Sequence, residues 1–139
     1  MKRRAAVMAI GIALLPPARA TPEAMAAAIR DFTGGAPLRE GRVKLEVAPL
    51  VDNGNTVPVS LSVPDLPPQQ VLALALFNER NPNPEVMRAS FGPRAGSRML
   101  ATRMRLATSQ ALVGVARLAD ASCWAQRIEV VVTLSACLE

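Results

Sequence analysis

The chain contains two cysteines and no histidine, and these facts bear most directly on its chemistry. Cys137 is followed only by Leu138 and Glu139. A segment that follows the last strand of a domain is usually accessible, and a thiolate attacks electrophilic sulfur well. No basic residue stands next to Cys137, so we expect a partner protein to activate its thiol. The sequence therefore predicts a thiol that carries a chemical group for other proteins.

The absence of histidine removes most ways of using a nucleophile for catalysis within this chain. Ser-His-Asp and Cys-His arrangements both need an imidazole as the base. A zinc site would have to use cysteines and carboxylates, and Cys123 and Cys137 are not at Cys-x-x-Cys spacing. No Gly-rich phosphate-binding loop precedes a helix. We therefore predict that the protein is not an enzyme and has no catalytic, cofactor-binding or metal-binding residues.

A disulfide between Cys123 and Cys137 is the alternative use of the two thiols. Cys123 stands at the start of the last predicted strand, and Cys137 lies beyond its end. A strand of roughly ten residues, rising about 3.3 Å per residue, separates them by about 30 Å. A disulfide needs Cα atoms within about 7 Å, so the tail would have to double back along the strand. We predict instead that Cys123 is a small buried residue.

Residues 1–20 are typical of a signal peptide for export. They begin with a basic Lys-Arg-Arg segment after the first Met, continue with an apolar run too short to span a bilayer, and end with the cleavage pattern Ala-Arg-Ala. The arginine pair allows the twin-arginine route, and the general secretory route stays open. We expect a periplasmic protein whose mature form begins at Thr21, forms one domain over residues 21–139 and has no membrane segment. An uncleaved anchor is the alternative.

Residues 21–139 carry much less net positive charge than the totals for the whole sequence indicate. The sequence has 16 basic and 11 acidic residues, but four of the basic residues and none of the acidic ones lie in residues 1–20. The remainder is almost neutral and has no run of lysine or arginine. Its aromatic residues are one tryptophan and three phenylalanines. These features argue against nucleic acid as a partner.

The hydrophobic pattern predicts one short helix followed by short strands. Residues 22–32 have apolar side chains on one helical face, and Gly34-Gly35 ends the helix. The predicted strands cover residues 43–47, 57–63, 71–77, 86–91, 100–106 and 112–118, and a last strand begins near Cys123 and alternates most clearly over residues 128–134. The segments between them are rich in Asn, Gly, Pro and Asp, which favour turns. We therefore predict an all-β fold, an immunoglobulin-like antiparallel β-sandwich of about seven strands with a short N-terminal helix.

Four residues within the predicted strands need separate comment. Pro58 interrupts its strand and predicts an edge strand or a bulge. Arg103 and Arg105 share one face of their strand, where they are solvated, paired with acids or placed at a partner interface. Trp124 is expected to belong to the core.

Several segments, in order, resemble the SoxY family, the sulfur-carrier subunit of the periplasmic thiosulfate-oxidising Sox system. The resemblance covers essentially the whole chain after residue 20. The matching segments are Gly41-Arg42-Val43, residues 52–59 (Asp-Asn-Gly-Asn-Thr-Val-Pro-Val), residues 81–84 (Asn-Pro-Asn-Pro), residues 91–96 (Phe-Gly-Pro-Arg-Ala-Gly), residues 102–107 (Thr-Arg-Met-Arg-Leu-Ala) with Ser109-Gln110, residues 120–124 and Val132-Thr133-Leu134.

The resemblance implies an immunoglobulin-like sandwich that forms a heterodimer with a second small sandwich protein, SoxZ. It implies that the tail cysteine, here Cys137, covalently holds sulfur-oxidation intermediates while separate Sox enzymes load, oxidise and hydrolyse them. The family tail is usually Gly-Gly-Cys-Gly-Gly, whereas Ser135-Ala136 and Leu138-Glu139 flank the cysteine here. Glycines keep a tail flexible and narrow enough to enter an active-site channel. Because they are missing here, this chain is either a variant carrier that serves different enzymes or one whose tail docks and whose carrier function is altered.

Two other functions remain possible from the sequence. The first is a non-catalytic binding or assembly sandwich in which Cys137 is inert or disulfide-bonded. The second is a small thiol enzyme, which the missing histidine argues against. The sulfur donor, the export route and the oligomeric state without a partner do not follow from the residues.

Overall fold

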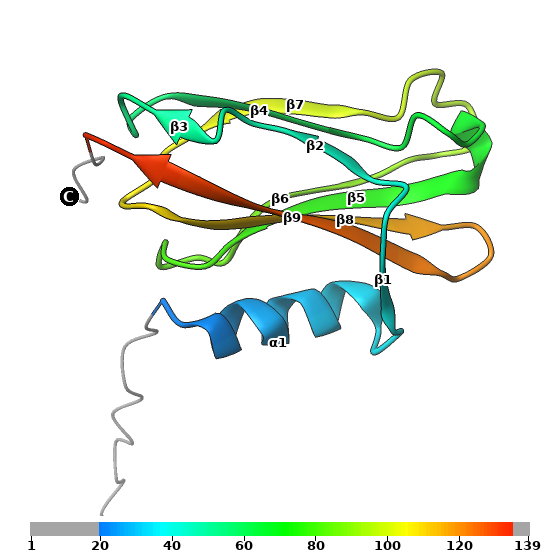
Figure 1. Ribbon diagram of the computed structural model, residues 1–139. Helices are drawn as coiled ribbons and strands as arrows, with labels where there is room; N and C mark the ends of the chain where they lie inside the picture. Colours follow the sequence, from blue (N-terminus) through cyan, green and yellow to red (C-terminus); the bar gives the residue numbers. More distant parts are fainter. Residues whose placement is uncertain (1–19, 135–139) are drawn as a thin grey trace, which may run out of the picture.

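The computed structural model describes residues 20–134, and these form three layers (Figure 1). Helix α1 (Pro22–Thr33) lies on one face of a six-stranded sheet, and a three-stranded sheet covers the other face. The larger sheet contains β1 (Leu38–Glu40), β3 (Leu50–Val51), β5 (Val71–Asn78), β6 (Glu85–Ser90), β8 (Gln110–Leu118) and β9 (Cys123–Val132). The smaller sheet contains β2 (Lys44–Glu46), β4 (Val57–Ser62) and β7 (Leu100–Met104), and a 3-10 turn, η1 (Pro68–Gln70), leads into β5.

The predicted all-β sandwich with a short N-terminal helix is confirmed, with two strands that the sequence pattern did not predict. The larger sheet has the order β1-β9-β8-β5-β6, and the smaller one β2-β4-β7. The additional strands are β1 and β3, and both pair with β9 in parallel. They span only three and two residues, too few to show the alternation that marks a strand in a sequence.

Helix α1 begins and ends where its terminal residues favour it. The Thr21 side chain accepts a hydrogen bond from the Ala24 backbone N–H at 3.1 Å, and Pro22 occupies the first turn. Gly34 adopts a left-handed conformation with φ of 65°, which glycine accepts without steric cost. Met25, Ile29 and Phe32 are buried against the sheet, as the sequence pattern predicted.

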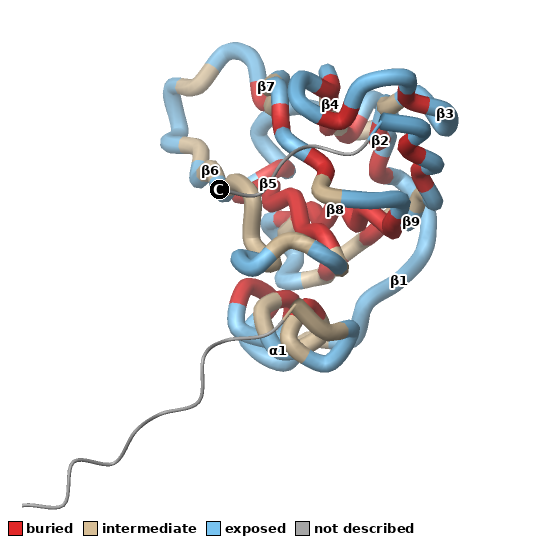
Figure 2. The backbone as a smooth tube through the Cα atoms, turned by 90° about the vertical axis from the view of Figure 1, so that its left-hand side faces the viewer, coloured by how far each residue is buried: buried red, intermediate tan, exposed pale blue. Residues whose placement is uncertain are grey.

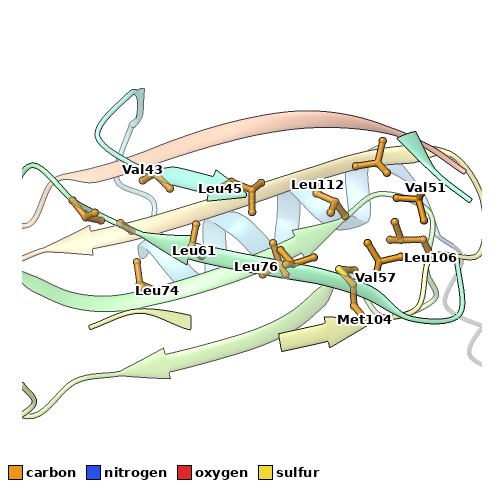
Figure 3. Close-up of a cluster of buried hydrophobic side chains, with 14 of the residues drawn as sticks. Val43, Leu45, Val51, Val57, Leu61, Leu74, Leu76, Met104, Leu106 and Leu112 are labelled. Carbon is orange, nitrogen blue, oxygen red and sulfur yellow. The ribbon is translucent and has the colours of Figure 1, made fainter. Parts of the chain in front are cut away.

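Strand β5 separates the two hydrophobic clusters of the molecule. Its alternating residues Leu74 and Leu76 face the space between the sheets, where they join the larger cluster (Figure 3). Ala73, Ala75 and Phe77 face α1 and join the smaller cluster. Because both faces of β5 are covered, the strand has a continuous apolar sequence instead of an alternating one. Figure 2 shows buried residues gathered between the layers and exposed ones along the loops.

Strand β4 is the central strand of the smaller sheet, so the prediction of an edge strand at Pro58 was wrong. β7 pairs with residues 57–61 of β4, and Pro58 lies opposite Arg103. On the other side, β2 pairs only with residues 60–62. At Pro58 the strand therefore has a single neighbour, and the missing N–H of proline removes no ladder bond on the open side.

Candidate functional site

Cys137 lies outside the described residues, so the structure locates the point from which its segment starts. Strand β9 ends at Val132, whose backbone N–H donates to the Ser109 hydroxyl at 2.8 Å. The Thr133 N–H donates to the Val51 carbonyl at 3.0 Å, and the Leu134 carbonyl accepts from the Gly54 N–H at 2.8 Å. Three successive residues are thus held by strand β3 and by neighbouring loops, and Cys137 follows three residues after the last of them.

Three large apolar residues near this anchor are exposed. Leu50 and Val131 are paired across β3 and β9, and they are 59% and 53% exposed. Leu134 is 60% exposed. We call these three residues the tail-root patch. Val131 lies on the outward face of β9, and the neighbouring Leu50 belongs to a two-residue strand that no sequence pattern revealed.

Cys123 is the first residue of β9 and is completely buried. Burial raises the pKa of its thiol above the ordinary value, and the charge of Asp120 adds to this, while that of Arg117 opposes it. A raised pKa keeps the sulfur in the protonated form, which is a poor nucleophile. The prediction that Cys123 is a small buried residue is therefore confirmed.

Arg103, in β7, and Arg105, directly after this strand, are exposed. Met104, between Arg103 and Arg105, points into the core, which sends both arginine side chains to the outer face. Neither forms an ion pair with another described residue. Of the three roles that the sequence left open, pairing with acids is thus not seen within the described chain.

The turn Asn81-Pro82-Asn83-Pro84 forms hydrogen bonds with neighbouring segments of the sandwich. The Asn81 side-chain amide donates to the Arg105 carbonyl at 2.7 Å, and its oxygen accepts from the Gln110 amide at 3.0 Å. Gln110 in turn accepts from the Arg80 N–H at 2.9 Å and is buried. The motif that stood out in the sequence therefore connects the β5–β6 turn to the segment between β7 and β8.

Trp124 is half-buried instead of fully buried, and it packs against the edge of the larger cluster. Its Nε1–H donates to the Ser122 hydroxyl at 3.0 Å. The Arg42 and Arg39 guanidinium carbons lie 4.8 Å and 5.6 Å from its ring centroid, distances typical of cation–π contacts. The assignment of Trp124 to the core was thus correct for one part of its side chain.

Within residues 20–134, no group of three or more His, Cys, Asp or Glu side chains is placed to hold a metal ion. In the same part of the chain, no helix has the length and hydropathy needed to cross a membrane.

Comparisons with known proteins identify both the fold and the family. Solved structures with a similar fold include a superoxide reductase (neelaredoxin) from Ignicoccus hospitalis, at 20% identity and TM-score 0.56 over 81% of this chain and 92% of that one. Another is a putative superoxide reductase from Thermotoga maritima, at 17% identity and TM-score 0.53 over 73% and 90% of the two chains. Identities this low support a common fold and nothing further. A search of curated proteins finds no significant match.

The family model described as "Sulfur oxidation protein SoxY" matches residues 29–137. This match spans most of the described sandwich and ends at the position of Cys137. It agrees with the resemblance seen in the turns and strands of the sequence. The chain belongs to the SoxY family of sulfur oxidation proteins.

Proposed function

We propose that the protein is a sulfur carrier that holds oxidation intermediates covalently on Cys137 and presents them to partner enzymes. SoxY proteins have a carrier role in sulfur oxidation and are not themselves catalysts. The observation that carries the proposal is the family match that extends to residue 137, three residues past the anchored Leu134. The missing histidine and the buried state of the other thiol also support Cys137 as the carrying residue.

Loading of thiosulfate on Cys137 is an oxidation. A sulfur–sulfur bond forms between the cysteine sulfur and the terminal sulfur of thiosulfate, and the S–H bond of the thiol breaks. The proton goes to solvent, and two electrons go to a redox enzyme that acts as the acceptor. The carrier supplies only the sulfur atom and its position, while the enzyme supplies the base and the oxidant.

The length of β9 argues against a disulfide with Cys123. Nine steps along the strand from Cys123 to Val132 cover about 30 Å at roughly 3.3 Å per residue. The five steps from Val132 to Cys137 span at most about 18 Å. Even a tail that turned straight back would leave the two Cα atoms about 12 Å apart, beyond the roughly 7 Å limit for a disulfide.

We further propose a periplasmic location and a heterodimer with a SoxZ-like sandwich. Sox proteins are generally periplasmic, and the family works with SoxZ and the Sox enzymes. Residues 1–19 lie outside the described part, so the signal peptide rests on its sequence pattern alone. Strands β6 and β7 end their sheets, and each offers backbone groups on one side that a partner strand could pair with.

Intact mass spectrometry of the protein from the periplasm tests the carrier role. We expect added masses of sulfur atoms, sulfonate or thiosulfate on the wild type, and none on Cys137→Ser. Cys123→Ser is the matched control, which should keep the added mass and lose some stability, because a buried thiol is replaced by a hydroxyl. Added mass that persists in Cys137→Ser would exclude this residue as the carrier. A wild-type mass lower by two hydrogens would instead indicate the disulfide-bonded assembly protein.

A further inference from the structure

Arg98 is the one charged residue among the described ones that is buried, with 7% of its surface exposed. Its Nη1 donates to the Val71 carbonyl at 2.6 Å, and its Nη2 donates to the Gly92 carbonyl at 3.0 Å. Its Nε–H has no partner. A guanidinium has five N–H donors, so these two bonds leave most of its capacity unused.

No carboxylate among the described residues pairs with this charge. None of the ion pairs among the described residues includes Arg98. The charged residues around it in the sequence are also all positive, because residues 86–119 contain six arginines and no aspartate or glutamate. A buried cation without a counter-ion is costly, and an anion bound from outside the chain would remove much of that cost.

Arg98 lines a cavity with a volume of about 270 Å³, which we call the Arg98 cavity. The other lining residues are Gln69, Leu72, Phe91 and Pro93. Three of these five side chains are apolar, and Arg98 provides the charge. A small pocket with apolar walls and few polar groups is the usual form of a binding site for a small molecule.

A β-bulge shapes the cavity wall independently of Arg98. Val71 pairs with Leu118 and Ala73 with Arg117 on β8, so Leu72 is an extra residue on β5. The bulge leaves Leu72 39% exposed, although the rest of β5 up to Asn78 is buried. Bulges often direct a side chain toward a functional site, and this one places Leu72 in the wall of the Arg98 cavity.

We propose that the Arg98 cavity binds a small organic anion. A carboxylate or sulfonate head would take the Nη N–H donors of Arg98 that the two carbonyls leave free, and a short apolar chain would lie against Leu72, Phe91 and Pro93. The loop from β6 to β7, which contains Arg98, lies at the opposite end of the sandwich from the end of β9 (Figure 1). The site is therefore separate from the tail that carries Cys137, and its test does not depend on the carrier function.

Nuclear magnetic resonance of the ¹⁵N-labelled protein tests the site directly. Sodium butyrate is titrated at constant ionic strength, and the Arg98 Nε–H and the backbone amides of Leu72 and Phe91 are followed. We expect saturable shifts, with a dissociation constant in roughly the millimolar range for a ligand this small. Acetate and sulfate should bind several times more weakly, because they lack the apolar chain. Absence of saturation in the wild type, or sulfate binding as tightly as butyrate, would overturn the proposal.

Two variants separate a specific site from general attraction to positive charge. Arg94 is exposed in the same loop, so Arg94→Gln removes an equal charge and should keep the affinity within about twofold. Arg98→Gln should weaken butyrate binding at least tenfold. Equal losses in the two variants would overturn the assignment to Arg98. If Arg98→Gln does not fold, saturation in the wild type and in Arg94→Gln, confined to the cavity residues, decides the question.

Discussion

The buried thiol of Cys123 makes the stability of the protein depend on pH. Burial raises its pKa, so the unfolded chain releases the thiol proton at a lower pH than the folded chain does. The contribution of Cys123 is therefore fully present below the ordinary thiol pKa and is lost as the pH rises through the raised value. We expect the unfolding free energy of the wild type to fall more steeply over this alkaline range than that of Cys123→Ala. Urea titrations at several pH values would show this, and parallel curves for the two proteins would contradict it.

Asn78 is buried at the end of β5, and neither polar atom of its side chain has a hydrogen-bond partner among the described residues. An unsatisfied buried amide costs about 1–3 kcal/mol. Asn78→Leu, which keeps the number and branching of the side-chain heavy atoms, should therefore raise the unfolding free energy by about that amount, measured by urea denaturation. Asn78→Asp should lower it, because it buries a charge. A destabilised Asn78→Leu variant would indicate that the amide has a partner such as an internal water molecule.

At the residue scale, the sequence predicted the burial of Cys123 but not the buried state of Arg98, and Cys137 as the carrying residue stays a prediction. Cys123 was predictable because it begins a strand beside Trp124 and is small and apolar. Arginine is mostly exposed in proteins, so a sequence gives no reason to expect one at 7% exposure. Its burial depends on the Val71 and Gly92 carbonyls, which come together only in the folded chain.

At the scale of elements, the sequence predicted the helix and the strands that bury enough apolar surface to produce a recognisable pattern of apolar residues. Strand β5 was predicted because both of its faces are covered, and α1 because one helical face is apolar. β1 and β3 were missed because their pairing with β9 depends on a neighbour more than 80 residues away. The same long-range pairing gives Pro58 a central strand, which local sequence argued against.

At Gly114 on β8, the two sheets approach each other closely. A Cβ added at Gly114 would overlap Leu61 Cδ1 from β4. Leu61 is 1% exposed and has little room to move. We expect Gly114→Ala to lower the unfolding free energy by about 1–3 kcal/mol, as for other overpacked cores. Gly92→Ala is a suitable control, because nothing lies within 4 Å of its added Cβ. Thermal denaturation of the two variants would measure the difference, and equal midpoints would mean that the sheets adjust freely.

At the scale of the whole molecule, the anchored end of β9 limits where a partner enzyme can be. Three residue steps lead from Leu134 to Cys137, and they span at most about 11 Å. If Cys137 is the carrying residue, as proposed, an enzyme that receives the thiol must bring its active site close to the tail-root patch of Leu50, Val131 and Leu134. Exposed apolar residues gathered in one place are common at protein interfaces. The two sheets thus determine which surface of the molecule lies next to the start of residues 135–139.

Charge on the tail-root patch should slow enzymatic loading of Cys137 without changing the thiol itself. Val131→Lys places an ammonium group where the enzyme surface has to approach, and desolvating that group is unfavourable. We expect kcat/KM for loading by the partner enzyme to fall about tenfold, which corresponds to about 1.4 kcal/mol. The rate of alkylation of Cys137 by iodoacetamide should stay unchanged, since the small reagent needs no docking surface. Met99→Lys is the matched control, because Met99 is 52% exposed in the loop beside Arg98, far from the patch. If both variants load as fast as the wild type, the enzyme reaches the thiol without touching the sandwich, and the tail alone determines recognition.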